Sequence, residues 1–482
     1  MSDGINDRQN VHRRRVRQSL IELAGGAIRG AGAPTQIISV VGGDDALSQR
    51  HARLVIDLCL RAGEAMLATG ASASDVVATV LRISDAYGIS AMHVDITFTS
   101  ITVSIHRGMN EDPLSVMRIV RVRTTDYTRL QAVYRLIDEI AGQQEPLDVD
   151  AARDRLTAIL ASPHPYRHWV VAAGQAILAS GVVVMFDVGI VLVLATAITA
   201  AMSHLIVRRL SRWSVPGFFA QMAAAVATTS IAVFIFWLRS VGIELPGSNS
   251  PTVIVIAGII TLLSGVGLTA SARDAIDGYY VTATARGMEV LMLTLGLAVG
   301  ISLVLGFALR IGVPVTIATS LGDRIGLVSG TVGAMLIGVG FALTTYVRLR
   351  LVLLMAMAAG GIFAVYSLVL PFATQPGLAP GIAGTVAGIV GYLAYRWVKV
   401  PEGAVTMAGI ISLIPGLAVY RALYGFMDAE FAVADTLPPV VMALATGIGL
   451  AAGTTIGGFG ARRLFGFDRQ AKLATQRSRA TR

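Results

Sequence analysis

The chain has 482 residues, of which 54% are hydrophobic and only 14% charged, and its formal net charge is +9. Soluble domains carry roughly 25% charged residues, so this composition excludes a wholly soluble protein and predicts membrane-spanning segments. The positive charge does not indicate nucleic-acid binding, because many arginines stand at the ends of apolar segments. A single cysteine, Cys59, excludes an intrachain disulfide.

The first third of the chain is polar. Residues 1–49 are predicted to form a basic, flexible arm. Its arginines precede an apolar run that is too short and too interrupted for a secretion signal. Residues 50–165 are predicted to form a cytoplasmic α+β domain. Its first helix is expected over 50–69. A stop and cap at Gly70–Asp75 separates it from a second helix that extends to about Tyr87. Two strands are expected over 90–105 and 115–122, followed by helices over 126–142 and 148–161.

One face of the first predicted strand carries a polar motif. His93, Asp95 and Thr97 alternate along the chain and therefore point to the same side of a sheet. A His/Asp pair with nearby hydroxyls suits hydrolysis or metal binding. Neither a nucleophile motif nor a second ligand cluster accompanies it, so no metal is predicted. The motif favours a face that docks on or stabilises the membrane domain, with a hydrolase site as the alternative.

Ten segments between residues 166 and 465 are apolar and long enough to cross roughly 30 Å of hydrocarbon. They are 169–187, 189–207, 217–238, 251–270, 283–309, 327–346, 349–371, 379–398, 403–424 and 438–460. Glycines recur in them at the four-residue spacing typical of closely packed transmembrane helices, as Gly296/Gly300, Gly384/Gly388 and Gly449/Gly453/Gly457. A basic cytoplasmic tail, 466–482, follows them.

The charges of the connections predict the orientation. With the N-terminus in the cytoplasm, the inside connections contain Arg208, Arg209, Arg212, Arg273, Arg286, Arg348, Arg350, Arg396, Lys399, Arg462 and Arg463. The outside connections then contain only Arg239, Arg310, Arg324 and Arg421. By the positive-inside rule, both termini are expected in the cytoplasm and the chain in the cytoplasmic (inner) membrane.

A nonamer recurs in the fourth and ninth predicted spans. Ala257–Gly265 (AGIITLLSG) matches Ala408–Gly416 (AGIISLIPG), 151 residues later (408 minus 257). Residues 166–310 and 311–465 are therefore predicted to be repeats of five helices. Because five is odd, the second copy is inverted, as in many secondary transporters. The sequence lacks an ATP-binding Gly-x4-Gly-Lys-Ser/Thr loop, which favours an ion gradient as the driving force and predicts no cofactor.

Charged residues cluster after the fourth predicted span, where the sequence is too apolar for a solvated loop. We expect irregular backbone there, buried or lining a wet cavity. Charges at such depth are functional or paired. Asp274, Asp277 and Glu289 are predicted to couple protons or bind a substrate ammonium group, and Arg273 and Arg286 a carboxylate. Two alternatives stay open: a local Arg286–Glu289 ion pair, and a plain loop role for Asp274 and Asp277.

A second group of candidates follows the break in the ninth predicted span. A proline inside a helix frees a backbone carbonyl, and broken helices turn their ends toward small ionic ligands. A structural kink alone is the alternative. The residues predicted near the substrate on this basis are Gly265, Pro415, Gly416, Tyr420, Arg421 and Tyr424.

These residues, in this order over about 50–460, resemble the threonine/serine exporter family. The N-terminal part of the resemblance lies in Arg61–Glu64, Gly70, Ser72, Ser74, Asp75 and His93–Thr97. The membrane part lies in Asp274, Gly278, Val281–Ala283, Ala285, Arg286, Glu289, Ala408–Ile410, Pro415–Leu417, Tyr420, Arg421 and Tyr424.

The resemblance implies ten helices, a cytoplasmic N-terminal domain and export of L-threonine and L-serine driven by the proton motive force. The fold class is then an all-α polytopic membrane protein of about ten transmembrane helices in two inverted five-helix repeats, behind an α+β domain. The leading hypothesis is an amino-acid/proton antiporter, not an enzyme. Its partners are the amino acid, protons and the bilayer, with homo-oligomerisation left open. The alternatives are a succinate-type dicarboxylate exporter, a membrane-tethered hydrolase and a passive channel.

Overall fold

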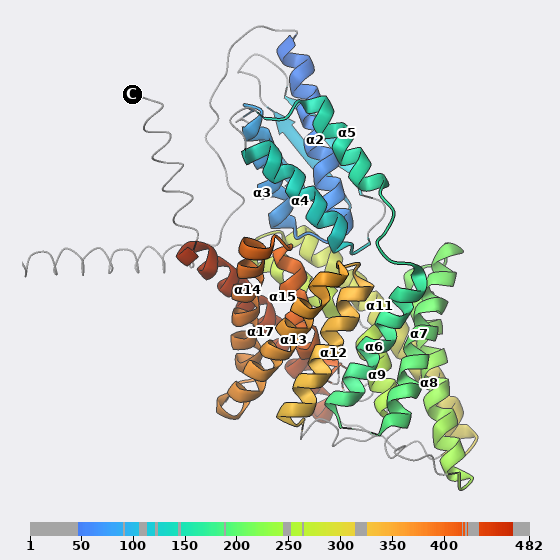
Figure 1. The fold of residues 1–482 in the computed structure, drawn as a ribbon. Coiled ribbons are helices and arrows are strands. Elements are labelled where there is room, and N and C mark those ends of the chain that lie inside the picture. The colour runs from blue at the N-terminus through green and yellow to red at the C-terminus, as the bar shows by residue number, and fades with distance from the viewer. Residues whose placement is uncertain are drawn as a thin grey trace, which may run out of the picture.

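The computed structural model describes residues 47–89, 92–105, 113–120, 124–142, 146–187, 189–243, 252–262, 265–313, 325–416, 418–419, 422 and 433–465. Most of the predicted arm, the predicted tail, and Tyr420, Arg421 and Tyr424 lie outside these residues. Figure 1 shows a small N-terminal domain standing on one end of a bundle of long helices.

The N-terminal domain combines helices with an antiparallel sheet of order β1-β2-β3. In chain order its elements are α2 (Leu47–Thr69), α3 (Ala73–Ala86), β1 (Met92–Ile96), β2 (Ser100–Ile105), β3 (Leu114–Ile119), α4 (Tyr127–Gly142) and α5 (Val149–Ala161). The single strand predicted over 90–105 is wrong, because this segment is the β1–β2 hairpin. Its turn is closed where the Thr97 backbone N–H donates to the Ser100 carbonyl at 2.9 Å.

The two faces of the sheet differ in polarity, as alternation along a strand requires. Ile101, Val103 and Ile105 of β2 are buried on the face covered by α2. The opposite face carries the predicted motif, with His93 paired in register with Ser104. This polar face is therefore not part of the core and is free to line a cavity.

Cys59 lies at the centre of the N-terminal domain, fully buried in α2. Burial raises the pKa of its thiol to about 12. Because the thiolate is the reactive form, we expect the folded protein to resist maleimide at neutral pH and to react once unfolded in guanidinium. Mass spectrometry of the labelled chain measures this. Rapid labelling of the native protein would contradict this expectation. In variants, protection of the Cys59 thiol from maleimide shows that the N-terminal domain is folded.

Eight described helices are long and apolar enough to cross a membrane, which makes this a multi-pass membrane protein. They are α6 (His168–Met185), α7 (Ile190–Arg212), α8 (Gly217–Ser240), α11 (Tyr280–Arg310), α12 (Leu327–Thr344), α13 (Leu349–Val369, continued by η1, Leu370–Phe372), α14 (Leu378–Val398) and α17 (Val433–Phe465). The fourth and ninth predicted spans have different forms. The fourth is two helices, α9 (Thr252–Leu262) and α10 (Gly265–Ile276), and the ninth is a shorter helix, α15 (Glu402–Ile410), followed by η2 (Ile411–Leu413).

The fourth predicted span differs most from its expectation. The sequence predicts one helix over 251–270 and irregular backbone after it, whereas α9 and α10 meet at 46° and α10 continues through Arg273 and Asp274. Alanine and arginine are good helix formers, and the Asp274 carboxylate finds a partner in Arg286 on α11, so the helix persists. Only the turn at 277–279 interrupts it, where Gly278 has a φ of +91°, a conformation that favours glycine.

The membrane helices form two groups with the same internal contacts. In the first half, α6 packs on α7, α7 on α8, and α8 on α11. In the second half, α12 packs on α13, α13 on α14, and α14 on α17. In both halves, therefore, the first helix contacts the second, the second the third, and the third the last.

The halves meet along α6 and α12, which lie side by side and run antiparallel (Figure 1). Gly174 near the start of α6 lies against Gly340 near the end of α12, and Gly181 farther along α6 lies against Gly333. A Cβ on Gly181 would lie 2.7 Å from the Gly333 carbonyl oxygen. The first helices of the two halves thus point in opposite directions across the bundle.

Glycines bring the third and last helices of each half into backbone contact. A Cβ on Gly300 would lie 2.5 Å from the Met222 carbonyl oxygen, and one on Gly453 would lie 2.0 Å from that of Gly381. The predicted packing role is confirmed, since every glycine of the three series meets the backbone of the neighbouring helix. The order of contacts along the helices shows that α8 runs parallel to α11, and α14 to α17.

The N-terminal domain holds the first half of the membrane domain through α3 and β1. Ser74 Oγ donates a hydrogen bond to Asp277 Oδ2 at 2.8 Å, in the turn between α10 and α11. Thr282 Oγ1 donates to the carbonyl oxygen of Ile96 at 3.1 Å. Helix α11 therefore begins beside the N-terminal domain and runs away from it.

Helix α4 holds the second half. The backbone N–H of Tyr127 donates to the Thr345 carbonyl at 3.1 Å, and Gln131 Nε2 donates to the Lys399 carbonyl at 2.6 Å. Helices α12 and α14 therefore end beside the N-terminal domain. The connections that it touches on both halves are among those predicted to lie inside.

Candidate functional site

The two broken helices bring their breaks together. In the first half the break separates Leu262 from Gly265, and in the second α15 passes through η2 to Pro415. A Cβ on Gly416 would lie 2.3 Å from the Ile260 side chain, so the second break touches the end of α9. The carbonyl of Leu262, the last residue of α9, accepts a hydrogen bond from the Gln221 side chain of α8.

A cavity of about 380 Å³ lies at these breaks and has walls from both halves. Pro415 and Gly416 line it, as the sequence predicts, together with Ile260. Most of the lining is apolar. Among its few polar groups, the Ser412 hydroxyl is buried and has no hydrogen-bond partner in the described part of the chain. The charged residues predicted on either side of the α10–α11 turn lie elsewhere.

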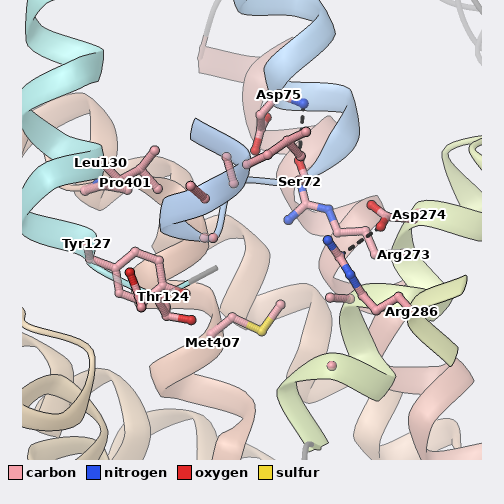
Figure 2. Close-up of a pocket in the computed structure, with 18 of the residues that line it drawn as sticks. Ser72, Asp75, Thr124, Tyr127, Leu130, Arg273, Asp274, Arg286, Pro401 and Met407 are labelled. Carbon is pink, nitrogen blue, oxygen red and sulfur yellow. Dashed lines mark hydrogen bonds and ion pairs between the residues drawn. The ribbon is translucent and has the colours of Figure 1, made fainter. Parts of the chain in front are cut away.

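Four of these charged residues line a second cavity, of about 250 Å³, at the junction of the N-terminal and membrane domains (Figure 2). Arg273 and Asp274 come from α10, and Arg286 and Glu289 from α11. The turn between α2 and α3, helix α4 and the start of α15 supply the remaining walls. We call this space the junction cavity. It gathers four of the predicted site residues and separates them from Pro415 and Gly416.

Asp274 and Arg286 form an ion pair in the junction cavity. Arg286 Nη1 lies 2.8 Å from Asp274 Oδ2, and Asp274 is fully buried. The alternative of a local Arg286–Glu289 pair is wrong, because Arg286 turns to α10 while Glu289 is exposed. Breaking a buried ion pair on one side costs about 3–5 kcal/mol, so each of the two charges holds the other in place.

Arg273 lies next to this pair with an unused donor. The residue is 8% exposed, and its Nε atom has no hydrogen-bond partner within the described residues. Asp277 Oδ2 is 3.9 Å from that atom, beyond hydrogen-bond distance, and instead accepts from Ser74. Asp277 therefore ties the two domains together, and the guanidinium of Arg273 keeps capacity for another anion.

The polar motif of the sheet lines a third cavity, of about 390 Å³, between β1 and the α10–α11 turn. His93 and Asp95 are exposed in it and face residues 277–279. Thr97 Oγ1 lies 2.7 Å from Ser100 Oγ, so this hydroxyl also closes the hairpin. The structure thus places the motif against the membrane domain and apart from Asp274.

Two tyrosines of α4 form the wall of the junction cavity on the side of the N-terminal domain. Burial raises the pKa of the Tyr127 and Tyr134 phenols above the ordinary value, and the negative charge of Asp75 raises that of Tyr134 further. Both hydroxyls therefore stay protonated at physiological pH and keep their hydrogen-bond donors.

Sequence reasoning misses Asp75 and Glu402 as members of the site. It identifies Gly70–Asp75 as a stop followed by a cap, and this is confirmed, since Ser72 is the N-cap and its Oγ accepts from the Asp75 backbone N–H at 3.2 Å. The Asp75 carboxylate also lines the junction cavity. Glu402 begins α15 beside the same cavity and pairs with Arg462 at 2.7 Å. Asp75 belongs to the residues that carry the family resemblance and stands in a helix first turn, but neither signal says what the turn faces.

Comparisons with known proteins agree with the membrane architecture. A family model described as "Putative threonine/serine exporter" matches residues 57–308, and one described as "Threonine/Serine exporter, ThrE" matches residues 330–459. No solved structure matches the chain.

Two curated relatives match along most of the chain. A "Probable threonine/serine exporter" of Mycobacterium tuberculosis is 34% identical over 425 residues, which cover 85% of this chain and 77% of the relative. A "Threonine/serine exporter" of Corynebacterium glutamicum is 30% identical over 414 residues, which cover 85% of this chain and 83% of the relative. With matches of this extent and helices that can cross a membrane, the chain belongs to the threonine/serine exporter family.

Proposed function

We propose that this chain is a secondary transporter that exports L-threonine and L-serine and is driven by the proton motive force. The names of the relatives support the substrates. The observation that carries the mechanism is the buried Asp274–Arg286 ion pair in the junction cavity, beside the broken span α9–α10. A cavity with both signs of charge suits a zwitterion, whereas a dicarboxylate would face the carboxylates of Asp75 and Asp274.

Coupling follows from competition for this pair. When a substrate enters, its carboxylate takes the Arg286 donors and its ammonium neutralises Asp274, so neither buried charge is left alone. A proton on Asp274 also releases the pair, but it removes the site for the ammonium group. Substrate and proton thus exclude each other, which is the condition for antiport. Asp277 and Glu289 remain candidates as further coupling acids, because both lie in the same charged region.

The two halves are proposed to be inverted repeats that move against each other. The antiparallel α6 and α12 support this. The third helices agree, because α8 runs parallel to α11 and away from the N-terminal domain, whereas α14 runs toward it. In such transporters the site opens alternately to either side of the membrane. Gly265, Pro415 and Gly416, at the meeting breaks, would then line the path of the substrate through the apolar cavity.

The N-terminal domain and both termini are proposed to lie in the cytoplasm, with the chain in the cytoplasmic membrane. The inside connections predicted from charge include those that the domain touches, which supports one common side. His93, Asp95 and Thr97 are assigned a docking role, because their cavity is shared with the α10–α11 turn.

Efflux from cells loaded with threonine-containing peptides tests the proposal. We expect cells with the transporter to export threonine and serine against a gradient, and an uncoupler to stop this export, because the proton gradient then supplies no driving force. Succinate efflux should equal that of cells without the transporter. Uncoupler-insensitive efflux that stops at equal concentrations would identify a passive channel, and succinate export a dicarboxylate carrier.

A further inference from the structure

We infer that the N-terminal domain supplies part of the substrate site, with Asp75 binding the ammonium group of the amino acid and Arg273 its carboxylate. The inference rests on the proposed function and deepens it, because it assigns the first cytoplasmic recognition of the substrate to both domains, before the substrate reaches Asp274 and Arg286.

The charges of the junction cavity fall into two kinds. Asp274 and Arg286 already neutralise each other at 2.8 Å. Arg273 is more than nine-tenths buried, and its Nε has no hydrogen-bond partner in the described chain. Asp75 has no ion-pair partner among the described residues, and its contact with Ser72 is made by its backbone N–H and not by its carboxylate. Besides the exposed Glu289 on α11, the cavity therefore offers one buried cation, Arg273, and one anion, Asp75, with spare capacity.

The spare charges come from opposite walls of the cavity. Asp75 lies in the first turn of α3, in the N-terminal domain, and Arg273 lies on α10, in the membrane domain. Figure 2 shows the Arg273 side chain reaching below the Ser72–Asp75 turn. An amino acid carries its carboxylate and its ammonium on one carbon, so a single molecule can bridge the two walls with a charge-assisted hydrogen bond at each end.

The turn that carries Asp75 is held in a fixed position. Ser72 Oγ caps the helix by accepting from the Asp75 N–H, and it lies 3.1 Å from Ser74 Oγ. Ser74 in turn donates to Asp277 of the membrane domain. The hydroxyls of Ser72 and Ser74 are thus used for positioning, while the carboxylate of Asp75 is left for a ligand. Ser74 provides a matched control, because it contacts the membrane domain without a free charge.

Binding of L-threonine to the purified full-length protein, measured by calorimetry, tests the inference. We expect Asp75→Asn to weaken binding by about tenfold or more, because it removes a charged hydrogen-bond acceptor, and Asp75→Glu to restore much of the affinity. Ser74→Ala should change it by less than about threefold, the range of a neutral contact at the domain junction. Protection of Cys59 from maleimide identifies the variants whose N-terminal domain is folded.

A second measurement separates recognition from structural support. The wild type should bind L-threonine far more tightly than 2,3-dihydroxybutanoate, which keeps the carboxylate and lacks the ammonium group. Asp75→Asn should lower this preference, whereas a merely structural change would weaken both ligands equally. An unchanged preference, or equal losses in the Asp75→Asn and Ser74→Ala variants, would overturn the inference. Its failure is distinguishable from failure of the proposed function, which would instead appear as wild-type protein that exports no amino acid.

Discussion

Threonine export is expected to fall to the background of cells without the transporter when Asp274 is replaced by asparagine. The amide can neither carry the coupling proton nor neutralise Arg286, which loses its partner at 2.8 Å. An uncompensated buried charge of this kind costs about 3–5 kcal/mol, so the junction cavity would also lose its arrangement. Uncoupler-sensitive efflux, normalised to the amount of membrane-inserted protein, measures the effect.

The double variant Asp274→Asn/Arg286→Gln separates coupling from stability. Removing both charges removes the unpaired guanidinium, so we expect thermal stability close to that of the wild type, while export remains absent. Normal efflux from Asp274→Asn, or recovery of coupled export in the double variant, would refute the assignment of Asp274 as the coupling acid.

The second large effect is expected for Gly453→Leu, at the contact between α17 and α14. Its Cβ would lie 2.0 Å from the Gly381 carbonyl oxygen, which belongs to the backbone and cannot move aside as a flexible side chain does. Overpacking typically lowers the free energy of unfolding by about 1–3 kcal/mol, and for a clash this close we expect a loss at or above the upper end of that range. We expect loss of monodisperse protein on size-exclusion chromatography in detergent, and a lower melting temperature for what remains.

Gly361→Leu is the matched control. Gly361 also lies in a membrane helix of the second half, α13, but nothing is within 4 Å of a Cβ placed there. Leucine is a better helix former than glycine by roughly 1 kcal/mol, so this variant should be as stable as the wild type or slightly more stable. Equal behaviour of the two variants would show that the α14–α17 contact does not hold the bundle together.

The sequence predicts well those features that depend on residues close together in the chain. Apolar length gives the positions of the long membrane helices, the spacing of Gly296 and Gly300 gives a packing face, and Ser72 with Asp75 gives a helix start. Each of these depends on residues within a few turns of one another. The same local reasoning recognises that Pro415 marks a break in the ninth span.

What sequence does not predict is which distant elements face each other. The Arg286–Glu289 spacing suggests a local pair, yet Arg286 pairs with Asp274 on another helix. Asp274 is buried, so leaving its charge without a partner would cost more than leaving the exposed Glu289 unpaired. Asp75 and Arg273 are far apart along the chain, and no periodicity relates them. The charges of α10 likewise suggest a broken backbone when read alone, whereas the ion pair of Asp274 with Arg286 on α11 allows this segment to remain helical.

The N-terminal domain holds one half of the bundle through Ser74 and the other through Gln131. If the halves rock to carry a substrate across, the two hydrogen bonds cannot both keep their lengths. One of them must then break and re-form in every transport cycle. The N-terminal domain would then take part in the conformational change and would not simply move with one half. The rate of transport would depend on how easily the weaker of these two hydrogen bonds breaks.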